Sequence, residues 1–130
     1  MGHTNGAELI IEQTQRAREI IQRVRSFIRK QPREAALIEL NDSIAQLSSL
    51  IQLECKDHDI TIKMNLYEEL PSVWGDAIQL QQVIMNLARN GVESIVAHDP
   101  EERLLIIEAA LSNQKEVQVT VADTGGGLDQ

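Results

Sequence analysis

The sequence predicts an α+β fold, in which a long N-terminal bundle-type helix precedes a partial α/β sandwich. Apolar residues recur every three or four positions over residues 7–30, and they alternate with polar residues over residues 59–66 and 116–123. The first spacing is typical of a helix with one buried face, and the second of a half-buried strand. Strands joined by a hairpin indicate a mixed or antiparallel sheet, and we expect helices to cover one face of it.

The stretch over residues 7–30 is predicted to form one helix. Its apolar positions are Ile10, Ala17, Ile20, Ile21, Val24, Phe27 and Ile28. Because such a length is unusual for an isolated helix and the apolar seam is narrow, we expect packing in a bundle or against a second chain. Pro32 ends the helix, since the residue before a proline resists the helical conformation.

A second helix is predicted to begin near Asn41 and Asp42, which can cap it, and to run to about Cys55. Its expected buried face holds Ile44, Leu47, Leu50 and Ile51.

A strand over residues 59–66 and a short strand over residues 72–74 are predicted next. Gly75 and Asp76 then begin a third helix, and the turn-forming sequence His98-Asp99-Pro100 ends it. Two more strands follow, over residues 103–111 and 116–123, on either side of the turn-prone Ser112-Asn113.

Composition narrows the classes of partner. The 130 residues carry a net charge of −8, with seven Lys/Arg against three Asp/Glu in residues 1–33 and five against seventeen in the remainder. The acidic remainder would be repelled by nucleic acid and by anionic membranes, so an anionic nucleotide would need Mg²⁺ and backbone N–H groups to attract it. The single Cys55 forms no internal disulfide, and no apolar run spans a bilayer, which indicates a cytoplasmic setting.

Asn86 and Asn90 interrupt the apolar pattern of the third helix. Four residues apart, they project from one side of the helix, so both amides can address one ligand. The spacing alone fits exposed asparagines equally well.

Asp123, Gly125 and Gly127 form a second group, in which a carboxylate at a strand end precedes glycines that permit positive φ and the close approach of a ligand. Alone, such a group is more often a turn.

Together the two groups resemble a known pattern. "LQQVIMNLARNGVES" followed by "VADTGGGL" is similar to the N box and first glycine box of the ATP-binding domain of bacterial sensor histidine kinases, a domain shared with type II topoisomerases and heat-shock chaperones. "QRAREIIQRVRSFIRK" resembles the second helix of the dimerisation and phosphotransfer domain of these kinases. The resemblance implies that residues 1–31 belong to that helix and residues 32–130 to the N-terminal part of the ATP-binding domain.

The resemblance also implies roles for these residues. Asn90 would be a Mg²⁺ ligand that bridges the nucleotide phosphates, and Asn86 would face the same phosphates. Asp123 would accept a hydrogen bond from the adenine amino group, and Gly125 and Gly127 would let the loop pass beside the base. Because guanine offers a carbonyl at that position, the resemblance implies ATP and not GTP.

The sequence departs from the family pattern in several ways. Gly91 stands where the family usually has alanine, which should weaken the helix by about 1 kcal/mol. The ATP lid and second glycine box expected after the first are not in this chain, nor is a helix with the phospho-accepting histidine; His58 and His98 are interpreted as surface histidines. We therefore expect a fragment that is inactive alone, from a parent kinase that phosphorylates a histidine and then a response regulator.

The sequence leaves two alternatives open. The first alternative to a kinase fragment is a non-catalytic dimerisation or binding module with a remnant ATP site. The anti-sigma group of serine kinases shares both boxes, although the N-terminal helix argues against that group. We also expect a homodimer or larger assembly through residues 9–28, because a lone dimerisation helix exposes its apolar seam.

Overall fold

The computed structural model describes residues 8–15, 20–25, 35–113 and 116–125. In chain order the elements are β1 (Glu8–Gln15), β2 (Ile20–Arg25), β3 (Ala35–Ile38), α1 (Leu40–Lys56), β4 (Thr61–Leu66), β5 (Val73–Asp76), α2 (Ala77–His98), β6 (Leu104–Asn113) and β7 (Glu116–Asp123).

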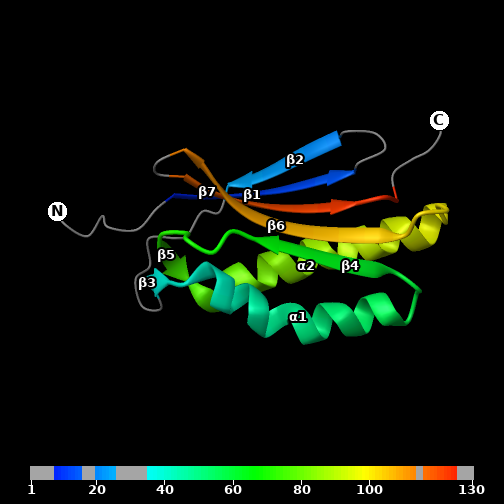
Figure 1. Cartoon of the computed structure of the whole chain (residues 1–130), viewed down its shortest axis with the longest axis horizontal. Coiled ribbons are helices and arrows are strands. Elements are labelled where there is room, and N and C mark those ends of the chain that lie inside the picture. The colour runs from blue at the N-terminus through cyan, green and yellow to red at the C-terminus, as the bar shows by residue number, and fades with distance from the viewer. Residues whose placement is uncertain (1–7, 16–19, 26–34, 114–115, 126–130) are drawn as a thin grey trace.

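The main sheet is mixed and has the strand order β2-β1-β7-β6-β4. The β6–β7 hairpin is antiparallel, whereas β4 runs parallel to β6 and β1 runs parallel to β7. Both helices cover one face of this sheet (Figure 1). The α+β class and the helix-covered mixed sheet predicted from the sequence are confirmed.

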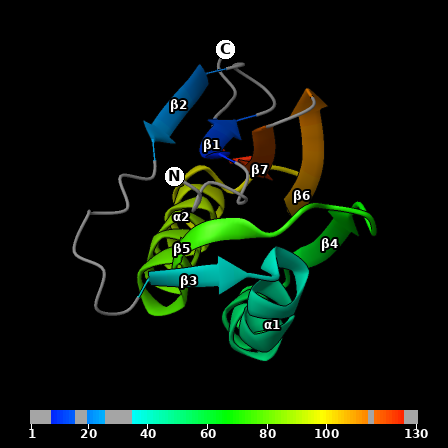
Figure 2. The same ribbon diagram turned by 90° about the vertical axis from the view of Figure 1, so that its left-hand side faces the viewer.

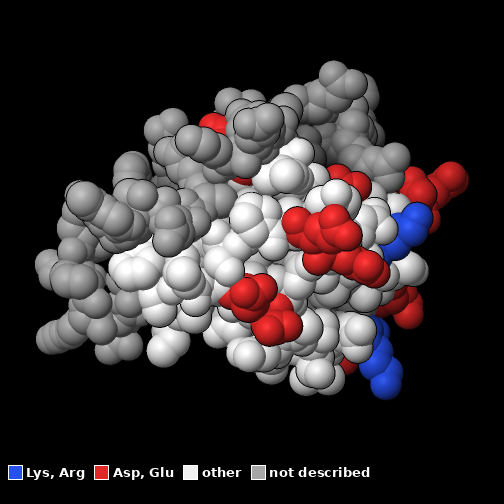
Figure 3. Space-filling view, turned by 60° about the vertical axis from the view of Figure 1, so that its left-hand side comes forward, with Lys and Arg blue, Asp and Glu red and all other residues white. Residues whose placement is uncertain are grey.

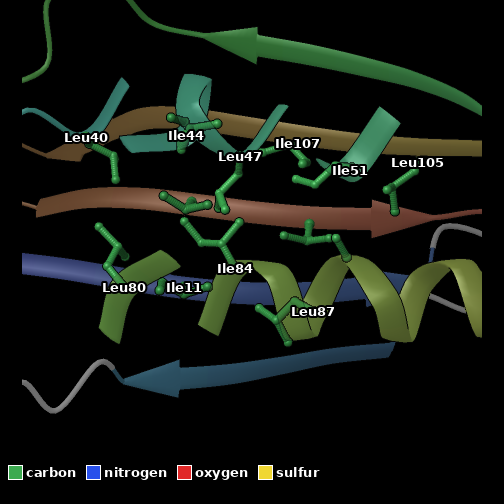
Figure 4. Close-up of a cluster of buried hydrophobic side chains, with 14 of the residues drawn as sticks. Ile11, Leu40, Ile44, Leu47, Ile51, Leu80, Ile84, Leu87, Leu105 and Ile107 are labelled. Atoms are coloured by element: carbon green, nitrogen blue, oxygen red, sulfur yellow. The ribbon is translucent and has the colours of Figure 1, made fainter. Parts of the chain in front are cut away.

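Alternating apolar residues form the core between the sheet and the helices. Val117, Val119 and Val121 of β7 are fully buried, as their period of two predicts. Figure 4 shows Ile11 of β1 in one cluster with residues from both helices and from β6. β7 is the central strand of the main sheet. Its last residue, Asp123, therefore lies in the middle of the layer that faces the helices.

α1 begins at Leu40, before the expected start, and without the expected cap. Its N-cap is Glu39, whose side chain caps nothing, and the Asn41 amide instead donates a hydrogen bond to the Tyr67 carbonyl at 2.8 Å. The expected place of Leu50 on the buried face is also wrong, because this side chain is 53% exposed. α1 rests on the sheet by a narrow stripe at intervals of three and four, which ends at the buried Cys55 and leaves Leu50 at its margin.

β3 is a strand that the sequence pattern did not predict. It pairs antiparallel with β5, with Leu37 opposite Trp74 in the register. Figure 2 shows this pair at the end of the molecule where both helices begin. Only four residues long, β3 offers too little alternation to be found without its partner strand.

The helix expected over residues 7–30 is wrong for the part of that stretch that the structure describes. β1 and β2 occupy it, and β1 pairs with the whole length of β7. Leu9 and Ile11 lie opposite Val117 and Val119 and are buried with them. Hydrogen bonding to an open strand edge and burial of an apolar face outweigh the weak helical preference of these residues. Leu9 and Ile11 are therefore buried within the chain's own fold, and assembly through residues 9–28 stays a prediction.

Part of that stretch lies outside the described residues. Phe27 and Ile28 are in this part, so the division of the chain into residues 1–31 and 32–130 also stays a prediction. Within the described ranges, neither helix combines the length and apolar character needed to cross a bilayer.

Candidate functional site

Asp123 is the last residue of β7 and points toward the helices. It follows the period of Val119 and Val121, lies opposite Leu105 of β6, and has no exposed surface. One carboxylate oxygen, Oδ1, accepts a hydrogen bond from the Gly125 N–H at 2.8 Å. The other, Oδ2, is buried and has no hydrogen-bond partner among the described residues.

The electrostatics of Asp123 follow from this burial. Loss of solvent raises the pKa of the carboxyl to about 6, against smaller lowering effects of the Gly125 N–H bond and the His98 charge. Such a carboxylate is poised to accept a hydrogen bond that no described residue supplies.

Gly91 on α2 is the nearest part of the helix to this carboxylate. A Cβ built at Gly91 would lie 2.7 Å from Cδ1 of Leu105, 3.3 Å from Cβ of Asp123 and 3.4 Å from its Oδ2. In the sequence, Gly91 stands out only as a departure from a family pattern. The structure places it in the site, where the missing side chain lets α2 approach β6 and β7.

A glycine is needed at position 125 because α2 leaves no room there for a side chain. A Cβ there would lie 2.5 Å from the carbonyl carbon of Ser94 and 2.5 Å from the backbone nitrogen of Ile95. Gly125 has no positive φ, so the backbone freedom expected of this glycine is not what it supplies. Its role is close contact with α2, and Gly127 lies outside the described residues.

Thr124 sets the direction of the chain between Asp123 and Gly125. Its hydroxyl donates to the Glu102 carbonyl at 2.6 Å and accepts from the Leu104 N–H at 3.0 Å. These bonds tie the end of β7 to the start of β6. Thr124 therefore turns away from α2, which brings the Asp123 side chain and Gly125 toward it.

Asn86 and Asn90 are both exposed on α2, in agreement with a solvent-accessible amide stripe. Ser94 continues the stripe at the same interval of four, and its backbone lies against Gly125. Asn90 thus lies one helical turn, about 5.4 Å along the axis, from the contact with the glycine loop, and Asn86 lies two turns away. The structure therefore places Asn90 at the margin of the group formed by Asp123, Gly91 and Gly125. Asn86 lies further from this group.

Ser94 and His98 were also missed as site residues. The ring Nδ1–H of His98 donates to the Ser94 carbonyl at 2.9 Å, and His98 is close enough to Asp123 to affect its pKa. The repeated interval of four from Asn86 through Asn90 to Ser94 and His98 was the available sequence signal. His58 is exposed at the end of α1.

The described residues contain no group of three or more His, Cys, Asp or Glu side chains that could hold a metal ion. A cation at this site would have to rely on amide and ligand oxygens. The exposed amide oxygen of Asn90 is a chemically suitable donor of this kind, since Mg²⁺ prefers oxygen ligands and keeps several waters.

Comparisons with known proteins point to sensor kinases, although no protein-family model matches the chain. The sensor protein TdiS of Thauera aromatica is 30% identical over 123 residues, which cover 94% of this chain and 22% of TdiS. The sensor histidine kinase TmoS of Ectopseudomonas mendocina is 29% identical over 122 residues, 93% of this chain and 12% of TmoS. The sensor protein FixL of Bradyrhizobium diazoefficiens is 28% identical over 117 residues, 90% of this chain and 23% of FixL.

The relatives of this chain are therefore sensor histidine kinases and related sensor proteins, which supports the family resemblance at that level. The chain spans about a fifth of the length of TdiS and FixL, and less of TmoS.

Proposed function

We propose that this chain is part of a cytoplasmic sensor histidine kinase of a two-component system, and that α2, the end of β7 and the following glycine loop form its ATP site. The observation that carries this proposal is the buried Oδ2 of Asp123, which no described residue satisfies. A buried acceptor without a partner costs about 1–3 kcal/mol, and a ligand that donates a hydrogen bond would recover that cost.

The proposed ligand group at Asp123 is the exocyclic amine of adenine. Asp123 Oδ1 is already engaged by Gly125, so Oδ2 is the free acceptor. Guanine would place a carbonyl oxygen against this carboxylate, and both groups would lose hydrogen bonds. The absence of side chains at Gly91 and Gly125 keeps the helix and the loop close to this carboxylate.

The proposed phosphate end of the site is the amide stripe of α2. Asn90 would supply an oxygen ligand to Mg²⁺, and Asn86 would face the phosphates further along the helix. When bound, Mg²⁺ would neutralise phosphate charge and help position the γ-phosphoryl group. Such neutralisation matters in a chain whose net charge is −8, because the protein alone repels a nucleotide.

The proposed parent reaction is transfer of the γ-phosphoryl group of ATP to a histidine, and from there to a response regulator. In this class of reaction the protein mainly positions groups and stabilises charge. The 130-residue chain by itself is not expected to autophosphorylate, and stable labelled phosphate on the purified chain would contradict that expectation.

Titration calorimetry with Mg-ATP and Mg-GTP on the 130-residue chain tests the proposal. We expect ATP to bind more tightly than GTP, Asp123→Ala to weaken ATP binding by at least about tenfold, and Asn90→Ala to reduce the dependence on Mg²⁺. Asn65→Ala is the matched control, since Asn65 is an exposed asparagine on β4. Absence of binding at millimolar ATP, or equal binding of GTP, would instead favour a binding module with a remnant site.

A further inference from the structure

We infer that a groove between α1 and α2 is a docking site for a basic amphipathic helix of another protein. The groove has a volume of about 340 Å³. It is lined by Glu54 and His58 on one side and by Arg89, Val92, Glu93 and Val96 on the other. This site is separate from the proposed nucleotide site, so the inference does not rest on that proposal.

The separation follows from helix geometry. Successive residues of an α-helix are about 100° apart, so residues two positions apart point to nearly opposite sides. Val92 and Val96 line the groove, whereas Asn90 and Ser94 belong to the stripe that meets the glycine loop. α2 therefore has one side for the candidate nucleotide site and another for the groove.

The groove offers apolar surface at its floor and margin. Val92 is 3% exposed and forms part of the core, whereas Val96 is 44% exposed. On α1, Leu50 lies four residues before Glu54 and so on the same side of the helix, and it is also largely exposed. An apolar strip of this kind, bordered by charged residues, is typical of a surface that contacts another protein.

The charge of the groove favours a basic occupant. Arg89 is paired with Glu54, with 3.5 Å between Nε and Oε2, and Arg103 is paired with Asp99 at 2.7 Å. Within the described part of the chain, Glu93 has no ion pair. Both helices also end near the groove, at Lys56 and His98, so the negative ends of both helix dipoles attract a cation there.

Helix packing explains why the occupant is assigned as a helix. α1 and α2 run in the same direction along the groove (Figure 1), and side chains of a third helix can enter the space between two such helices. Its apolar face would contact Val92, Val96 and Leu50. An arginine or lysine beside that face would pair with Glu93.

Acidic character alone does not define the site. Figure 3 shows a face of the molecule on which acidic side chains gather. Basic side chains lie near one edge of the described part of this face. A basic partner would therefore be attracted to much of the molecule. Binding at the groove must be distinguished from this general attraction by its position and by its apolar component.

The test uses a synthetic helical peptide with leucines on one face and arginines beside them, titrated into the isotope-labelled 130-residue chain and followed by NMR. We expect saturable shifts at Val92, Val96 and Glu93, and weaker binding by about tenfold for Glu93→Arg. Val96→Ser should also weaken binding. Glu68→Arg, the same charge change at an exposed residue outside the groove, should not.

Several results would overturn the inference. Equal weakening by Glu68→Arg, or shifts centred away from the groove, would show attraction by general charge only. Equal binding of a peptide with glutamates in place of the arginines would remove the charge argument. Groove shifts caused by raising the concentration of the chain alone would assign the groove to a second copy and exclude a different partner.

Discussion

Gly91 on α2 lies directly against Asp123 at the end of β7, and a Cβ at position 91 would be 3.4 Å from the carboxylate Oδ2. This contact connects the two sequence groups that suggested a ligand site. The helix that carries Asn90 is held against the strand that ends in Asp123 because position 91 has no side chain. Small changes at this contact should alter both stability and the geometry around the carboxylate.

We expect Gly91→Ala to destabilise the protein by about 1 kcal/mol, even though alanine favours helix. The new Cβ would meet Cδ1 of the fully buried Leu105 at 2.7 Å, and that conflict should exceed the gain in helix propensity. Urea denaturation of a double-mutant cycle checks this. In a Leu105→Val background, which lacks the conflicting methyl group, Gly91→Ala should cost less or become stabilising; equal costs in both backgrounds would contradict the explanation.

Gly125→Ala should be more damaging than Gly91→Ala. Its Cβ would meet backbone atoms of Ser94 and Ile95 at 2.5 Å, and backbone cannot move aside as a side chain can. We expect the loop to lift from α2, the Gly125 N–H bond to Asp123 to break, and stability to fall by about 1–3 kcal/mol.

A rescue experiment tests whether the backbone of α2 or the side chain of Ser94 limits the space at position 125. Ser94→Gly removes the Oγ that would also lie 2.5 Å from a Cβ at position 125, but it leaves the backbone in place. It should therefore fail to restore the thermal stability of Gly125→Ala. Full restoration would show that the side chain, and not the helix backbone, limits position 125.

The ionisation of Asp123 should lower stability as the pH rises. Its pKa is raised from 3.8 to about 6 in the folded protein, so between these values the folded state keeps a proton that the unfolded state has lost. The contribution of this group to the free energy of unfolding should therefore fall by about 3 kcal/mol as the pH rises through this range.

The control for this effect is Asp123→Asn, which cannot ionise. Denaturation of both proteins from pH 3.5 to pH 7, a range chosen to span both pKa values, should show the difference between them growing in favour of the asparagine variant. A wild-type protein that gains stability relative to Asp123→Asn with rising pH would contradict the raised pKa.

Two helix starts that look alike in the sequence should respond differently to mutation. Asp76 Oδ1 accepts hydrogen bonds from the N–H groups of Ile78 and Gln79, at 2.9 and 3.1 Å, and so caps α2. Asp76→Ala should cost about 1 kcal/mol. Asp42→Ala should cost less than about 0.5 kcal/mol, because Asp42 lies in the first turn of α1 and only interacts with its dipole. Comparable losses in thermal denaturation would indicate that Asp42 has an unseen capping role.

The features predicted well from the sequence depend on local chemistry. The period of two marked β4 and β7, and the turn and cap residues marked the ends of α2, where Asp76 caps the start and Asp99 adopts the left-handed conformation at the end. These signals work because each depends on a few neighbouring residues. The same local spacing identified Asn90 and Asp123 as candidates, although it could not show that they lie near each other.

The sequence by itself thus determined the α+β class and the order of elements from β4 to β7, and it supplied the candidate residues of the proposed ligand site. Only the tertiary structure decided that the described part of residues 8–25 forms strands, because the open edge of β7 and the burial of Ile11 compete with a helical pattern that local spacing alone favours. It also decided that Gly91 lies against Asp123 and that Oδ2 of Asp123 lacks a partner among the described residues. Both depend on contacts between segments far apart in the chain, and no local pattern encodes those distances.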